Sequence, residues 1–275
     1  MRRKRKIGVI VQSLKLGLKE GIEKAKELGA DGFQVYVTSG ELYPDNIDKQ
    51  GRADFKKFVA DKGLEISALC ADFNWKKGFL DEEHNRENKP RIRKCLDLAV
   101  DLDVRVVTMH IGTLPEDESD PVYQEALRTS IELAQYAEER GRVLATETGP
   151  EDTVGLLRFL QKIPSKGIGV NYDPANLVMC GPFDHIGGVG ILRDYIVHTH
   201  AKDGVCLGEG KYVELPLGQG GVVFPYWLAA LDKIGYDGFL TIEREVGDNP
   251  VEDVANAIKY LRSLEETDLP EVPWD

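Results

Sequence analysis

No uninterrupted apolar run in this 275-residue sequence approaches the roughly 18 residues that a membrane-spanning helix needs. The start, MRRKRK, is basic like the beginning of a signal peptide, but the apolar run after it, IGVIV, is too short for one. We therefore expect neither a membrane span nor a targeting peptide. Charged residues make up 30% and hydrophobic residues 42% of the chain, which is enough for a large core in a protein of the cytoplasm.

Cysteine is also scarce. The four cysteines are Cys70, Cys95, Cys180 and Cys206. They form neither a CxxC pair nor a dense framework, so a disulfide scaffold is excluded and reduced thiols of the cytosol are expected. Each is predicted to be a small buried side chain, and none is predicted to act as a nucleophile.

Basic residues are in the minority. The sequence has 47 acidic residues against 35 Lys and Arg, which gives a formal net charge of -12. A field of that sign opposes binding to a phosphate backbone, so we expect no nucleic acid partner and a small-molecule substrate instead. The basic start is interpreted as a solvated terminus rather than a nuclear-localisation signal.

What the chain does have is a regular alternation of β-rich runs and helical stretches. The eight β-rich runs begin at Lys6, Gly32, Glu65, Arg105, Arg142, Gly167, Tyr195 and Phe239. Near-continuous apolar and β-branched residues are typical of parallel strands buried on both faces. We predict an α/β fold, a (β/α)8 TIM barrel, as a single domain over residues 1–275 with an extended C-terminal tail at 265–275. An open flavodoxin-like sheet is the alternative, but it would need fewer strands.

Ionisable side chains follow several of these strands. The candidates are Glu147 in ATETGPED, Asp173 in NYDPANL, His200 in HTHAKD and Glu243 in TIEREV. In a barrel, the carboxyl ends of the strands share one mouth, and a buried carboxylate there needs a partner. The set suits one divalent metal ion, with Mn²⁺ or Mg²⁺ favoured and Co²⁺ or Zn²⁺ allowed. The alternative is a set of local ion pairs, such as Glu243 with Arg244.

Three histidines lie at or near the same strand ends. His198 and His200 are two positions apart on one strand, so they face the same side at different depths. We predict that His200 reaches the mouth, whereas His198 lies deeper in the core. For His110, in TMHIG, the sequence leaves open whether it binds a substrate hydroxyl or packs.

Together these segments resemble the xylose isomerase-like TIM-barrel superfamily, which includes sugar isomerases, epimerases and endonuclease IV relatives. The most specific piece is the run from LPLGQGG to TIERE. The resemblance implies the same four metal ligands and adds Lys202, in the HxKD pattern, as a substrate contact. Where ketose 3-epimerases carry a histidine, this chain has Asn176, so Asn176 is expected to contact the substrate in a different way. Where many relatives carry glutamate, the chain has Gln34.

The resemblance implies an enzyme. The expected reaction is isomerisation or epimerisation of a ketose or polyol-derived substrate through a metal-stabilised ene-diolate, with Glu147 and Glu243 as the catalytic pair and with His110 and Lys202 orienting hydroxyls. An inosose-type dehydratase is the alternative, since the same intermediate can expel a β-hydroxyl. A noncatalytic sugar-binding barrel and an abasic-site endonuclease are minor alternatives, the latter because the rich histidine and aspartate set of endonuclease IV is missing. The sequence leaves a homo-oligomer open.

Overall fold

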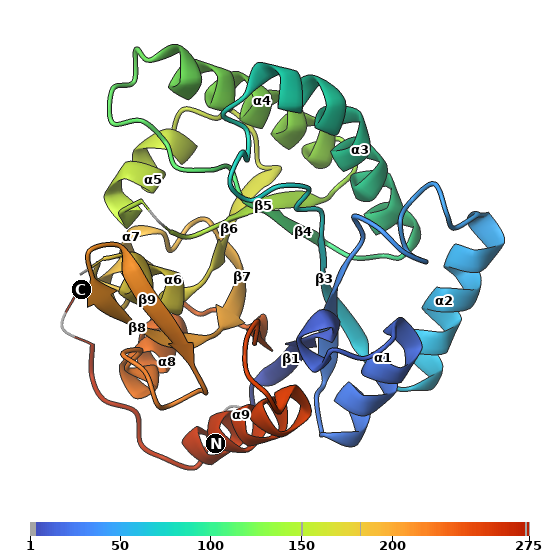
Figure 1. The fold of residues 1–275 in the computed structure, drawn as a ribbon, viewed down its shortest axis with the longest axis vertical. Coiled ribbons are helices and arrows are strands. Elements are labelled where there is room, and N and C mark those ends of the chain that lie inside the picture. Colours follow the sequence, from blue (N-terminus) through green and yellow to red (C-terminus); the bar gives the residue numbers. More distant parts are fainter. Residues whose placement is uncertain (1–3, 150, 182, 273, 275) are drawn as a thin grey trace.

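Eight parallel strands close into a barrel at the centre of the molecule (Figure 1). This computed structural model describes residues 4–149, 151–181, 183–272 and 274. The barrel strands are β1 (Lys6–Ile10), β2 (Gly32–Tyr36), β3 (Glu65–Cys70), β4 (Val106–Met109), β5 (Val143–Glu147), β6 (Ile168–Tyr172), β7 (Ile196–Ala201) and β10 (Phe239–Ile242). Their order around the barrel follows the sequence, and β1 pairs with both β2 and β10. The predicted single-domain TIM barrel is confirmed, and the open sheet is excluded.

Helices surround this barrel. They are η1 (Val11–Leu14), α1 (Leu18–Glu27), α2 (Lys49–Asp61), α3 (Glu82–Asp101), α4 (Pro121–Glu138), α5 (Thr153–Leu160), α6 (Pro174–Cys180), α7 (Gly187–Ile191), α8 (Phe224–Lys233) and α9 (Pro250–Leu264). Aspartate side chains begin several of them: Asp81 accepts a hydrogen bond from the backbone N–H of His84, and Asp152 caps α5 in the same way. Gly29 and Gly235 follow α1 and α8 with φ of 92° and 74°, the left-handed geometry expected of a glycine at a helix end.

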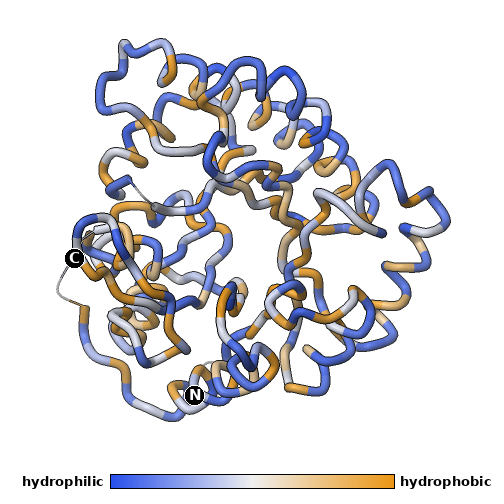
Figure 2. Tube along the Cα trace, in the orientation of Figure 1, coloured by the Kyte–Doolittle hydropathy of each residue, from blue (hydrophilic) through white to orange (hydrophobic). Residues whose placement is uncertain are grey.

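The core lies between the strands and the inner faces of these helices. Every residue of β5 and β6 is buried, as the continuous apolar runs predicted. In Figure 2 the outward-facing sides of the helices are mainly hydrophilic, and the sides that face the barrel are mainly hydrophobic. Among the described residues, no helix combines the length and the apolar character that crossing a membrane requires.

The cysteine prediction is only half right. Cys70 and Cys95 are buried, but Cys180 at the end of α6 and Cys206 are exposed. The described residues that follow α9 form neither helix nor strand, while 273 and 275 of the predicted tail lie outside the described residues.

A two-stranded antiparallel hairpin interrupts the alternation after β7, and the sequence analysis did not anticipate it. It consists of β8 (Asp203–Gly208) and β9 (Lys211–Leu215). The turn residues Glu209 and Gly210 both have positive φ, 52° and 71°, as a two-residue hairpin turn requires. The hairpin packs on α6 beside the carboxyl end of the barrel.

The first prediction concerns the tight contact at the start of β2. A β-carbon on Gly32 would lie 2.4 Å from the carbonyl oxygen of Glu65 and 2.6 Å from the ring of Phe239. We expect Gly32→Ala to lower the free energy of unfolding by about 1–3 kcal/mol, because the backbone must move to admit the methyl group. Gly17→Ala is the matched control, since nothing lies within 4 Å of its added carbon. Equal urea midpoints for the two variants would contradict this account.

Candidate metal centre

Four ionisable side chains meet in the mouth of the barrel. They are Glu147, Asp173, His200 and Glu243, and each offers one ligand atom within 4.8 Å of the others. Glu147 ends β5, His200 lies in β7, and the two others directly follow β6 and β10. All four are buried. The structure thus brings together the four residues proposed from the sequence, whose role as ligands stays a prediction.

Asp173 shows how local structure aims one of these groups. The segment Asp-Pro-Ala-Asn begins α6, with Asp173 as N-cap and Pro174 in the first turn. The Oδ1 atom accepts hydrogen bonds from the backbone N–H of Ala175 at 2.8 Å and of Asn176 at 3.2 Å. The Oδ2 atom is buried and has no hydrogen-bond partner among the described residues. An unpartnered buried carboxylate oxygen aimed into the cluster is what a cation site requires.

The electrostatics of the cluster point the same way. Burial, together with the charges of Glu147 and Glu243, raises the pKa of Asp173 to about 8, although Lys202 lowers it. Burial by itself would lower the pKa of His200, but Glu147 and Glu243 outweigh it and raise that pKa well above the ordinary range. The His200 Nδ1 atom lies 3.4 Å from Glu147 and 3.3 Å from Glu243. Three carboxyl groups therefore gather around one imidazole, and a divalent ion would stabilise the charged form of Asp173 that burial disfavours.

Lys202 supplies a second positive charge to this cluster. Its Nζ atom donates to Glu243 Oε2 at 3.0 Å and to Glu245 Oε2 at 2.6 Å, and the residue is buried. The local pairing of Glu243 with Arg244, considered from the sequence, is not what forms. Arg244 instead donates to Glu214 in β9 and to the side chain of Asp253. The predicted contact of Lys202 with a substrate stays a prediction.

The histidine pair divides as the sequence suggested. His200 Nε2 lies 2.9 Å from Gln34 Oε1, and because an amide oxygen can only accept, that nitrogen carries the proton. This leaves Nδ1 facing the carboxylates. His198 is two residues earlier on β7 and outside the four-residue cluster; it contacts Asn171 Oδ1 at 2.8 Å and Thr241 Oγ1 at 3.0 Å. Gln34 is therefore a partner of the site that the sequence analysis treated only as a missing acid.

His110 lies on the rim of the same mouth. Its Nδ1 atom is 2.5 Å from Asp72 Oδ2, and its Nε2 atom is 3.7 Å from Glu147 Oε1. Burial lowers the pKa of His110, but Glu147 and Asp72 outweigh it and raise that pKa to about 9. At neutral pH His110 is thus a cation that can donate a hydrogen bond. Asp72, its partner, was not anticipated from the sequence.

Two asparagines hold Glu147 in place. Asn176 Nδ2 donates to Glu147 Oε1 at 2.8 Å, and Asn171 Nδ2 donates to Glu147 Oε2 at 3.1 Å. Asn176 was expected to contact the substrate, and that contact stays a prediction. In the structure its side-chain amide donates a hydrogen bond to Glu147, a candidate metal ligand. Glu151, also missed, has both carboxylate oxygens buried without a partner among the described residues, and burial raises its pKa to about 7.

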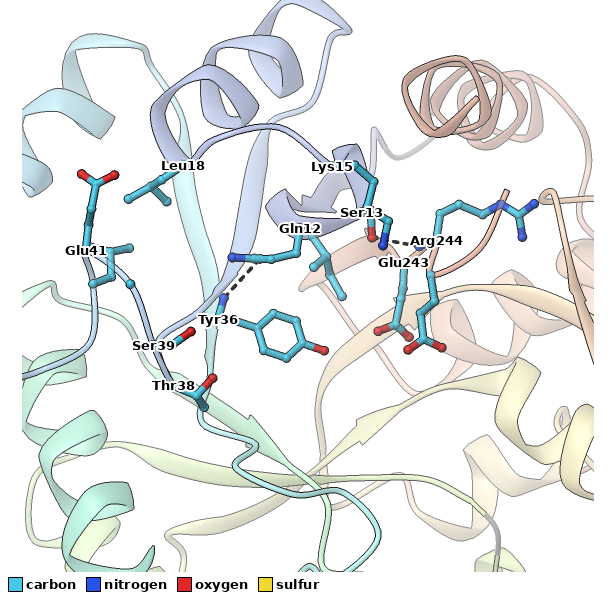
Figure 3. A pocket seen from close by; sticks show the side chains of 14 residues that line it. Gln12, Ser13, Lys15, Leu18, Tyr36, Thr38, Ser39, Glu41, Glu243 and Arg244 are labelled. Carbon is cyan, nitrogen blue, oxygen red and sulfur yellow. Dashed lines mark hydrogen bonds between the residues drawn. The ribbon is translucent and has the colours of Figure 1, made fainter. Parts of the chain in front are cut away.

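The residues present fit a divalent cation. Three carboxylates and one imidazole form an oxygen-rich donor set, and the free Asp173 Oδ2 gives the set an unsatisfied acceptor. A pocket of about 590 Å³ adjoins Glu243 between η1 and the loop after β2. Figure 3 shows Tyr36 in this pocket, with its ring directed towards Glu243. A small polar molecule can therefore reach the cluster from this side.

The second prediction separates the two histidines. His200→Ala should lose bound Mn²⁺, because it removes the nitrogen that faces the three carboxylates. His198→Ala should keep the metal but lower the free energy of unfolding by about 2–4 kcal/mol, since it leaves a cavity and strands Asn171. Metal content by mass spectrometry and urea denaturation measure the two effects. Metal loss in His198→Ala, but not in His200→Ala, would show that His198 and not His200 is the ligand.

Proteins of known sequence resemble this chain along most of its length. An uncharacterised protein of Methanocaldococcus jannaschii is 27% identical, over 90% of this chain and 84% of the relative. The L-ribulose-5-phosphate 3-epimerase UlaE of Salmonella paratyphi C is 22% identical, over 89% and 88%. The inosose dehydratase of Geobacillus thermodenitrificans is 23% identical, over 86% and 87%.

Solved structures share the fold. A xylose isomerase domain protein from Planctomyces limnophilus superposes with a TM-score of 0.86 at 26% identity, covering 96% of this chain and 98% of its own. A xylose isomerase-like TIM-barrel protein from Mycobacterium smegmatis, in complex with magnesium, gives 0.73 at 18% identity, covering 95% and 96%. The sequence model of the xylose isomerase-like TIM-barrel family matches residues 22–264 of this chain. With the barrel and its ionisable mouth, this match shows that the chain belongs to the xylose isomerase-like TIM-barrel family.

Proposed function

We propose that the protein is a divalent-metal-dependent isomerase or epimerase of the cytoplasm, acting on a ketose or a polyol-derived carbonyl compound. The observation that carries the proposal is the buried cluster of Glu147, Asp173, His200 and Glu243 with its unpartnered carboxylate oxygen. Relatives named as sugar epimerases support the substrate class. A divalent ion in that cluster, Mn²⁺ or Mg²⁺ by preference, would act as a Lewis acid towards a carbonyl oxygen and lower the cost of an ene-diolate.

The side chains around the cluster divide the remaining work. Glu147 and Glu243 come from β5 and from the end of β10, on different sides of the barrel mouth. One carboxylate removes the proton next to the carbonyl, and the other returns a proton to the opposite face. His110 and Lys202, both positively charged, orient substrate hydroxyls. Asn171 and Asn176 keep the Glu147 carboxylate in one orientation.

A dehydratase is the second candidate function, and one observation favours it. Expulsion of a β-hydroxyl needs a general acid close to the base that takes the carbon-bound proton. His110 lies 3.7 Å from Glu147 and is held by Asp72, so an acid and a base are adjacent. The similarity to an inosose dehydratase agrees with this alternative. Activity against a panel of ketoses, inososes and hydroxypyruvate, with the metal present, distinguishes the two reactions by their products.

The noncatalytic alternative and the endonuclease alternative receive less support. A binding barrel would not need two ordered carboxylates facing the same imidazole at 3.3–3.4 Å. The net charge of -12 opposes a DNA substrate, and a small sugar remains the proposed partner. An abasic-site duplex added to the same panel tests the endonuclease alternative, which nicking would support.

The third prediction concerns metal removal. EDTA should abolish activity and lower the melting temperature, because an ion bound only by the folded chain stabilises it by mass action. Mn²⁺ added in excess should restore both. Differential scanning fluorimetry and the substrate panel provide the measurements. A chelated protein with full activity and an unchanged melting temperature would remove the metal from the mechanism.

The fourth prediction concerns the paired glutamates. Glu147→Gln or Glu243→Gln keeps the side-chain shape and one oxygen ligand but removes the basic carboxylate, so turnover should fall at least ~10²-fold. Metal binding should weaken less than in the corresponding alanine variants. In D₂O, the wild-type epimerase should place deuterium on the substrate carbon. Rates like the wild type in both glutamine variants, with metal still bound, would place the acid and base elsewhere.

A further inference from the structure

Basic residues gather at the amino end of the barrel, the end opposite the candidate metal centre. One of them precedes each of four neighbouring strands: Arg105 before β4, Arg142 before β5, Lys166 before β6 and Arg193 before β7. Arg142 donates to Asp103 at 3.4 Å. The other three side chains are exposed and form no ion pair with any residue that the structure describes. In a chain with a net charge of -12, they make this end of the barrel a local concentration of unpaired positive charge.

These three cations line one pocket of about 1100 Å³, here called the amino-end pocket. Strands β5, β6 and β7 and helices α5 and α7 contribute its apolar lining, which consists of Val143, Ile168, Val197, Val154, Leu157 and Ile191. Two of these apolar side chains remain in contact with water, since Val154 is 43% and Ile191 is 36% exposed. Apolar walls combined with a few charged groups are typical of small-molecule sites.

Trp274 adds an aromatic side to the amino-end pocket. Its ring packs on α7, where a β-carbon on Gly190 would lie 3.1 Å from the indole. The Lys233 ammonium, on α8, lies 4.9 Å from the centroid of the ring system. The glycine thus leaves room for the indole against α7, and the indole presents apolar surface in the same pocket as the unpaired cations.

Two acidic side chains, Asp184 and Asp194, also line the amino-end pocket, and among the described residues neither pairs with its cations. Asp184 Oδ1 accepts hydrogen bonds from the backbone N–H of Ile186 at 3.0 Å and of Gly187 at 2.8 Å, so it is engaged in the turn that begins α7. Asp194 is exposed to solvent. Because the cations outnumber the carboxylates, the charge of the pocket favours an anion with one or two charges over a cation.

We propose that the amino-end pocket binds a small organic anion. The apolar part of the ligand, a ring or a short chain, lies against the valines and Trp274. Its phosphate or carboxylate group is bound by the cations, above all by Lys166 and Arg193, which precede the adjacent strands β6 and β7. Burial of the apolar part adds to the affinity. The pocket lies at the opposite end of the barrel from Glu147 and Glu243, so its ligand is distinct from the proposed substrate, and the inference stands apart from the proposed function.

Isothermal titration calorimetry on the full chain with Mn²⁺ present tests the proposal with four probes. The probes 1-naphthyl phosphate and 1-naphthoate carry both a ring and a charge, 1-naphthol carries only the ring, and inorganic phosphate carries only the charge. We expect at least one of the charged naphthalenes to bind at a single site, about tenfold more tightly than 1-naphthol or inorganic phosphate. The tighter of the two identifies the anionic group, and its affinity should fall as the salt concentration rises. Equal affinity for 1-naphthol would overturn the anionic class of the ligand.

The variant Lys166→Gln/Arg193→Gln should bind the tighter probe about tenfold more weakly than the wild type. Its matched control is Lys49→Gln/Lys56→Gln, which removes the same charge from exposed positions on α2 and should bind like the wild type. Equal weakening in both variants, or none in either, would overturn the site, as would the failure of both charged naphthalenes to bind. His200→Ala, measured without metal, should retain the wild-type affinity for the probe. Loss of probe binding in His200→Ala would place the probe at the candidate metal centre and overturn the proposal.

Discussion

Three carboxylates held together away from water are the constraint on which the mouth of this barrel is built. Glu147, Asp173 and Glu243 come from separate strand ends and are all buried. Like charges at such distances are unfavourable unless positive charge and hydrogen-bond donors surround them. The imidazole of His200 and the ammonium of Lys202 provide the charge. A barrel is suited to this arrangement because its hydrogen-bonded strands hold the backbone of each of these residues in a fixed position around one mouth.

The same constraint explains the polar interior beneath the cluster. His198, Asn171 and Thr241 form a chain of hydrogen bonds inside the barrel. A buried polar network is stable only when its members satisfy one another, and this one ends on the carboxylate of Glu147. The hydrogen bonds beneath the cluster therefore help to orient the Glu147 carboxylate.

The sequence predicts much of this arrangement and misses its partners for a physical reason. One rule, that parallel strands end at a common mouth, was enough to select Glu147, Asp173, His200 and Glu243 together. No rule of spacing could join His200 to Gln34, which lies 166 positions away, or His110 to Asp72 on a neighbouring loop. The hairpin after β7 did leave a signal. Short β-rich runs at 205–207 and 211–213 lie on both sides of Glu209 and Gly210 and favour two strands, but the sequence analysis did not single them out.

Fold and family together still leave the chemistry to a few side chains. Relatives on this scaffold are named as epimerases and as a dehydratase, so the barrel by itself does not select the product. The difference must lie in what flanks the shared cluster. Here those flanking features are the charged pair of His110 and Asp72 and the pocket beside Tyr36.

The hydrogen bond from His200 to Gln34 has a consequence for how the proposed site would take up a metal ion. Before any metal arrives, protonated His200 carries hydrogen on both ring nitrogens, one directed to Gln34 and one towards the carboxylates. At the proposed site, the second hydrogen lies on the nitrogen that would bind the ion. Metal binding there would release this proton. Binding of the metal ion should then be tighter at alkaline than at acidic pH, so that the pH of the surroundings influences how much of the protein carries metal.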